Sequence, residues 1–215
     1  MAREPQRFPG YDVVGERAHW DPVTAGVVLA RLAPPPALRF FAPGEEAVGV
    51  ALVDLLLAQD SDDGASGGPG PENRRIPVLS MIDSRLAEAQ TDGWHYADMP
   101  EDGAAWKASL AHLDADAHER YGAGFAACAR EQRATLVQAV RELGDRSWHG
   151  MPAAQVWSLW TRYACTAYYS HPWAWDEIGF GGPAYPRGYK NRGVGRREPW
   201  EVADQVDLDP VPGDR

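Results

Sequence analysis

Pairs of histidine and acidic residues stand at helical spacing near the middle of the chain. In HLDADAHER, His112 and Asp116 are four residues apart, and so are Asp114 and His118. Residues at this spacing share one face of a helix, where two side chains can supply two ligands to a metal ion. No third ligand is evident beside them, and such pairs are common on solvated helices. The sequence therefore favours a solvated face over a metal site.

Other catalytic motifs are scarce. A di-iron or di-manganese centre in a helical bundle needs Glu-x-x-His on two helices together with further glutamates. Only Glu16–His19 has that spacing, and it precedes the first expected helix. The sequence also lacks a P-loop, a nucleophile elbow and an HExxH motif. Two cysteines, Cys128 and Cys165, exclude a disulfide framework or a CxxC-type zinc site, and we expect both to be small buried residues within helices.

His171 is the remaining candidate for acid–base chemistry. Asp176 and Glu177 follow it by five and six residues, so a carboxylate could assist its imidazole. A structural histidine whose ring nitrogens are satisfied by hydrogen bonds is the favoured interpretation. The sequence is thus poor in catalytic apparatus.

Apolar residues at helical spacing predict the elements that carry these side chains. The pattern favours an all-α fold, an irregular bundle of about six helices closed by a long C-terminal arm. No alternating run long enough to predict a strand is present. The expected helices cover residues 23–32, 43–59, 77–90, 104–121, 125–143 and 152–170.

Composition shifts predict the organisation of the chain. Proline and glycine interrupt residues 1–20, which we expect to be irregular. Residues 21–170 form the expected helical domain, with a flexible loop at 60–75 that is rich in Gly, Ser, Pro and Asp. The aromatic and basic arm covers 171–200, and the acidic end at 201–215 is expected to fray.

The arm combines large aromatic residues with residues that interrupt regular structure. In HPWAWDEIGFGGPAYPRGY, at 171–189, prolines and glycines argue against a regular helix or central strand. The preceding helix is apolar on most of its circumference, which predicts a central position. The arm either covers its own core or docks a second chain, and the two interpretations are compatible. The expected partner-binding residues are Tyr168, Tyr169, His171, Trp173, Trp175, Phe180, Tyr185, Arg187 and Tyr189.

Charge and length exclude several classes of partner. The chain has 215 residues, a net charge of -10 and 44% hydrophobic residues, which fits one globular domain. An acidic chain does not suit nucleic acid or an anionic membrane surface as main partner. The first residues lack the apolar region of a signal peptide, and no twin-arginine motif stands near the start. We therefore expect a cytoplasmic protein without direct membrane insertion.

Several segments resemble a known family. IPVLSMIDSRLAE, ASLAHLDADAHERYGAGFAAC, EQRATLVQAV and YACTAYYSHPWAWDEIGFGGPAYPRGY follow one another as in the small subunit, subunit 3, of gluconate 2-dehydrogenase-type complexes. The resemblance extends over about Glu45 to Tyr189, and the YYSHP and IGFGG segments are its most specific parts.

The resemblance implies a non-catalytic accessory and maturation subunit. It implies no cofactor in this chain and FAD in a large partner subunit of the glucose-methanol-choline (GMC) oxidoreductase type, which would oxidise a sugar, sugar acid or glycoside as a dehydrogenase or oxidase. Exported members carry a twin-arginine signal, and a multihaem cytochrome c often accepts the electrons. Because this chain lacks the signal, we expect an intracellular flavoprotein partner and doubt a cytochrome c subunit. Two alternatives stay open: a stand-alone metal- or histidine-dependent helical enzyme, and a small-ligand-binding helical module with the arm as its lid.

Overall fold

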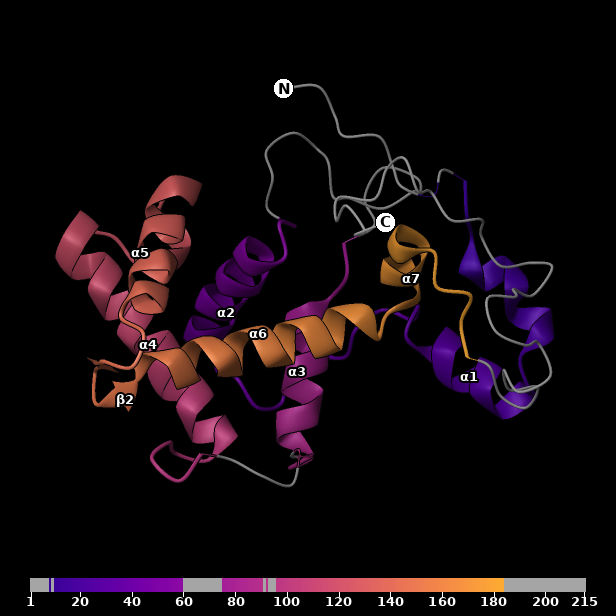
Figure 1. Ribbon diagram of the computed structural model, residues 1–215, viewed down its shortest axis with the longest axis horizontal. Helices are drawn as coiled ribbons and strands as arrows, with labels where there is room; N and C mark the ends of the chain where they lie inside the picture. Colours follow the sequence, from indigo (N-terminus) through magenta and orange to yellow (C-terminus); the bar gives the residue numbers. More distant parts are fainter. Residues whose placement is uncertain (1–7, 9, 60–74, 91, 93–95, 184–215) are drawn as a thin grey trace, which may run out of the picture. The chain divides into compact units, whose positions relative to one another are not determined.

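The described part of the chain is mostly helical. The computed structural model describes residues 8, 10–59, 75–90, 92 and 96–183 (Figure 1). The all-α prediction is confirmed, because the described strands form only one small antiparallel sheet. The elements are η1 (Val13–His19), α1 (Pro22–Ala30), α2 (Pro43–Leu56), α3 (Val78–Ala87), α4 (Asp102–Tyr121), η2 (Phe125–Ala127), α5 (Arg130–Glu142), β1 (Ser147–Trp148), β2 (Met151–Pro152), α6 (Ala153–Tyr169) and α7 (Pro172–Ile178).

The contacts divide the chain into two compact units. The bundle unit comprises Pro35–Asp62 and Pro77–Tyr168, and the arm unit comprises Met1–Pro34, Asp63–Ile76 and Tyr169–Arg215. Residues 21–34, which are expected in the helical domain, group here with the residues from Tyr169 onward. The expected loop at 60–75 and the tail at 201–215 lie outside the described residues, apart from Arg75.

In the bundle unit, helix starts follow local chemistry. Pro43 occupies the first turn of α2, and the Glu45 carboxylate accepts a hydrogen bond from the Ala42 N–H at 2.7 Å. The segment before α2 is held by Asp83 of α3. This buried carboxylate accepts hydrogen bonds from three successive backbone N–H groups, at residues 39–41, over 2.7 to 2.9 Å. The cost of removing this carboxylate from water is thereby offset by hydrogen bonds from N–H groups that would otherwise be unsatisfied.

Helix α6 has the central position that its sequence predicts. The side chains of Val156, Trp160 and Tyr163 are at most 1% exposed. Trp160 Nε1 donates to Ser109 Oγ of α4 at 2.9 Å, and Tyr163 Oη donates to Asp102 Oδ2 at 2.7 Å. Burial and this hydrogen bond raise the pKa of Tyr163 to about 12, so its hydroxyl remains a donor.

The segment around Cys128 corrects two predictions. The helix expected from residue 125 begins at Arg130, because Cys128 and Ala129 are extended and only the short η2 precedes them. The Phe125 N–H is instead satisfied by Asp114 Oδ1 at 2.8 Å. Cys128 is buried outside a helix, whereas Cys165 lies in α6 and is exposed. The expectation of two buried helical cysteines is therefore wrong for the helical position of Cys128 and for the burial of Cys165.

A tight hairpin joins α5 to α6. β1 and β2 pair through Trp148 and Met151, and the turn residues His149 and Gly150 have positive φ values of 47° and 84°. This is the backbone conformation that two-residue hairpins favour, and it is unusual for a residue other than glycine or asparagine. Asp116 holds the hairpin, because its carboxylate is 2.9 Å from Trp148 Nε1 and 2.7 Å from His149 Nε2.

Candidate docking surface of the arm

The first part of the arm forms a short helix, which corrects the expectation of irregular structure at 171–183. Pro172 stands at the first position of α7, where a missing N–H costs nothing. His171 is its N-cap, and Gly179 ends it with a left-handed φ of 67°. The residues that argued against a helix are therefore its start and stop signals.

His171 is a structural residue of this helix. Its side chain is 1% exposed. Nδ1 accepts a hydrogen bond from the Trp173 N–H at 3.2 Å, so Nε2 carries the proton and donates to the Arg31 carbonyl at 3.0 Å. Burial lowers the pKa of His171 to about 4. Because both ring nitrogens are engaged and the ring is enclosed, the imidazole is placed to fasten the chain rather than to exchange protons with a substrate.

The N-terminal segment covers one side of α7. Asp176 is fully buried, and its Oδ1 accepts a hydrogen bond from the Val13 N–H at 2.7 Å. The Trp20 and Trp175 rings meet edge to face at 6.4 Å between centroids. The buried apolar cluster of the arm unit consists of Val13, Trp20, Val28 and Trp175. The segment at 1–20 is thus not simply irregular: it contains η1, capped by Asp12.

Two glycines of the arm allow aromatic rings to approach the backbone. A Cβ at Gly179 would stand 2.7 Å from the Phe8 ring, and one at Gly182 would stand 2.6 Å from the Trp20 ring. Both glycines also have positive φ values. The IGFGG segment is therefore a close-packing element for the N-terminal segment.

The structure separates the predicted partner-binding residues into three groups. Tyr168, His171 and Trp175 are buried, at 8%, 1% and 6% exposure, and Trp173 is half-buried. The Trp175 indole also donates from Nε1 to the Tyr169 carbonyl at 2.6 Å. Tyr169 and Phe180 are exposed, at 49% and 39%. Tyr185, Arg187 and Tyr189 lie outside the described residues.

Three exposed apolar side chains of the arm unit were missed by the sequence analysis. Ile178 ends α7 at 47% exposure, and Val23 and Val27 of α1 are 77% and 55% exposed. A signal was available for α1, since Pro22–Ala30 contains no charged residue and places Val23 and Val27 one turn apart. A short apolar helix without a polar face indicates either burial or an exposed contact surface.

The histidine–carboxylate pairs do not assemble a metal centre. His118 Nδ1 lies 3.5 Å from Asp114 Oδ2, and His19 Nε2 lies 3.3 Å from Glu16 Oε2 on η1. Asp116 binds the hairpin instead of pairing with His112. Within the described ranges, no group of three or more histidine, cysteine or acidic side chains could hold a metal ion. In the same ranges, no helix is long and apolar enough to cross a membrane.

Comparison with known proteins identifies the family. Residues 43–182 match the family model described as gluconate 2-dehydrogenase subunit 3. No curated protein and no solved structure shows significant similarity to the chain. The match covers α2 to α7 and ends in the IGFGG segment, whereas η1 and α1 precede it. The chain therefore belongs to the gluconate 2-dehydrogenase subunit 3 family, whose members are accessory subunits of dehydrogenase complexes.

Proposed function

We propose that this chain is the non-catalytic small subunit of a complex whose large subunit is an FAD-dependent oxidoreductase of the GMC type. The large subunit would oxidise a CH–OH group of a sugar, sugar acid or glycoside, and this chain would bind it and support its maturation. The proposed complex is a hetero-oligomer in the cytoplasm. Family membership supports the subunit role, and the features of the arm unit support the place of contact.

The distribution of exposed apolar side chains carries the docking proposal. Among the described residues, the exposed large hydrophobic side chains are Val23, Val27, Tyr96, Tyr169, Ile178 and Phe180. All of them except Tyr96 belong to the arm unit. Apolar and aromatic side chains that remain in water on a subunit are the groups whose burial would stabilise an interface.

The buried aromatic residues of the arm have a supporting role in this proposal. The Trp175 ring contacts Phe180 edge to face at 5.3 Å between centroids, and its indole N–H binds the Tyr169 carbonyl. A buried Trp175 thus holds the Phe180 ring and the backbone of Tyr169, which lie after and before α7 in the sequence. Side chains that are already ordered lose less conformational entropy when a partner covers them.

Capture of the partner tests the proposal. The tagged chain is produced in its own cells and captured, and the bound protein is assayed for flavin absorbance and for sugar oxidation with an artificial electron acceptor. We expect a flavoprotein with dehydrogenase or oxidase activity. In the variant Tyr169→Ser/Ile178→Ser we expect at least a tenfold loss of captured flavin, because contacts at the centre of interfaces contribute about 2 kcal/mol or more each.

Tyr96→Ser is the matched control, because Tyr96 is also exposed but lies in the bundle unit. This variant should capture as much flavin as the natural sequence, and circular dichroism should show that all variants are folded. Equal capture by the double variant would refute the docking surface. Capture of no flavoprotein by any variant would refute the complex itself.

The rival interpretation as a histidine-dependent enzyme has less support. It requires an imidazole that reaches substrate, and the His171 ring is enclosed with both nitrogens bonded. Turnover by the purified chain in the absence of a flavoprotein would favour that rival.

A further inference from the structure

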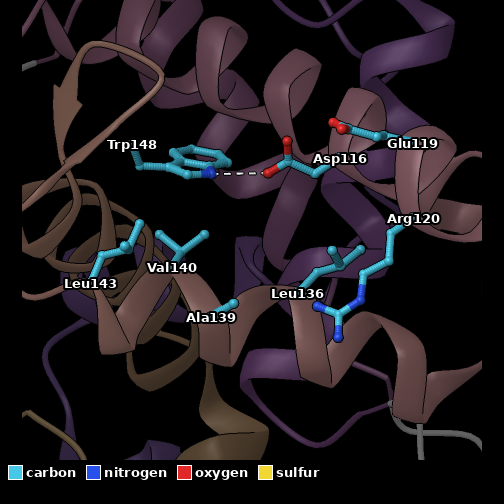
Figure 2. A pocket seen from close by; sticks show the side chains of 8 residues that line it. All are labelled: Asp116, Glu119, Arg120, Leu136, Ala139, Val140, Leu143 and Trp148. Atoms are coloured by element: carbon cyan, nitrogen blue, oxygen red, sulfur yellow. Dashed lines mark hydrogen bonds between the residues drawn. The ribbon is translucent and has the colours of Figure 1, made fainter.

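A groove in the bundle unit has no part in the docking proposal. It lies between α4 and α5 and has a volume of about 480 Å³ (Figure 2). Three residues of α5 and its C-cap residue, spaced by one helical turn or less, form the apolar floor: Leu136, Ala139, Val140 and Leu143. The volume is in the range of small-molecule sites, which are mainly apolar with a few placed polar groups.

The indole of Trp148 lines the groove and is held in place by its neighbours. Trp148 Nε1 is held by Asp116 Oδ2 at 2.9 Å. Its ring also meets His112 and Trp160 edge to face, at 5.7 and 5.6 Å between centroids. Because this wall is already fixed, a ligand would not have to order it on binding.

The charged rim of the groove is not symmetrical. Both oxygens of Asp116 are engaged, Oδ2 by Trp148 and Oδ1 by His149 at 2.7 Å. The Arg120 guanidinium, in contrast, lies over the Tyr121 ring at 5.5 Å and has no hydrogen bond or ion pair within the part of the chain that the structure describes. In Figure 2 the Arg120 side chain reaches toward Leu136, and Glu119 also lines the groove. The positively charged group beside the apolar floor is therefore the Arg120 guanidinium.

We propose that this groove binds an amphipathic monocarboxylate, with the carboxylate on Arg120 and the apolar body along α5 toward Trp148. A guanidinium binds a carboxylate through two parallel hydrogen bonds, which also fixes the direction of the ligand. From Leu136 to Leu143 the floor is about 10 Å long at 1.5 Å per helical residue, which corresponds to an acyl chain of about eight carbon atoms.

Titration calorimetry of the full-length chain with hexanoate, octanoate and decanoate tests the site. Affinity should rise about fourfold for each added CH₂ until the floor is covered. Gluconate, a carboxylate with a hydroxylated body, should not bind, because its hydroxyl groups would be desolvated against leucine and valine. Octanol should bind at least tenfold more weakly than octanoate, since it lacks the charge that Arg120 recognises.

Two variants test the contributions of the charge and of the apolar floor to binding separately. Arg120→Gln should weaken octanoate binding at least tenfold and leave octanol binding unchanged. Ala139→Phe should abolish binding of both, because Ala139 is an exposed residue of the floor and a phenyl ring would fill the groove. Arg141→Gln is the control: Arg141 lies on α5 outside the groove, over the Trp157 ring, and its loss should change nothing.

The proposal would be overturned by the absence of octanoate binding at millimolar concentration in a folded protein. It would equally be overturned by affinity that does not depend on chain length, or by normal octanoate binding to Arg120→Gln. None of these outcomes bears on the flavoprotein partner, because no residue of the arm unit lines the groove.

Discussion

Asp176 in the C-terminal arm accepts a hydrogen bond from the backbone N–H of Val13, 163 residues earlier in the sequence. Both residues are fully buried. Replacing Asp176 with alanine leaves that N–H unsatisfied in an apolar cluster, which should cost about 1 to 3 kcal/mol. We expect a lower midpoint in urea and faster proteolysis of the N-terminal segment. Asp145→Ala, at an exposed position, should stay within about 0.5 kcal/mol of the natural sequence, and equal effects of the two variants would contradict the assignment.

Gly179 and Gly122 offer a matched pair for the contact between the N-terminal segment and the arm. Both end a helix with similar left-handed φ values, 67° and 71°. A Cβ at Gly122 meets open space, whereas one at Gly179 meets the Phe8 ring at 2.7 Å. Gly122→Ala should therefore cost only the left-handed strain, about 1 to 2 kcal/mol, and Gly179→Ala should cost at least about 1 kcal/mol more.

The double variant Phe8→Ala/Gly179→Ala completes this test. Removal of the ring should cancel the extra cost of the alanine at residue 179, so that a double-mutant cycle shows coupling between the two positions. Additive free energies of unfolding would mean that Phe8 does not occupy this place.

His171 should make stability fall in mild acid. Its folded pKa is about 4, against about 6.5 for an unfolded histidine, so the unfolded state binds more protons between these values. The contribution of neutral His171 is complete above about pH 6.5 and is lost as the pH falls toward 4, to a limit of about 3 kcal/mol. His171→Asn keeps an N-cap acceptor but cannot titrate. Urea midpoints at several pH values should fall less steeply for His171→Asn, and identical pH profiles would contradict this role.

The two cysteines should differ in reactivity. Cys165 is exposed on α6 and Cys128 is buried. A thiol reagent should modify one cysteine of the native chain quickly, and both in urea, because reaction requires access. Cys165→Ser should remove the fast phase. A fast phase that persists in this variant would show that Cys128 is accessible.

Start and stop chemistry explains how much of the fold was predictable. The helix expected at residues 23–32 is present as α1, and in the structure Asp21 is its N-cap and Pro22 stands in its first turn. The same chemistry was present at His171, Pro172 and Gly179. There the proline and glycine argue against a helix in the sequence, because α7 has only seven residues and no helical period is visible over so short a stretch.

The candidate site was only partly predictable for a different reason. The aromatic content of the arm indicates large buried or contact surfaces. It does not indicate which rings are buried and which are exposed. Trp175 is buried by Trp20 and Val13, which come from the other end of the chain. Local periodicity carries no information on such long-range packing, so exposed Ile178 was missed while buried Trp175 was included.

Hydrogen exchange of the chain, alone and bound to its flavoprotein partner, tests the central claim most directly. The account predicts that binding slows exchange in the arm unit, at residues 169–183 and in α1, and leaves α4 and α5 unchanged. Slower exchange confined to the bundle unit, with the arm unit unaffected, would contradict it.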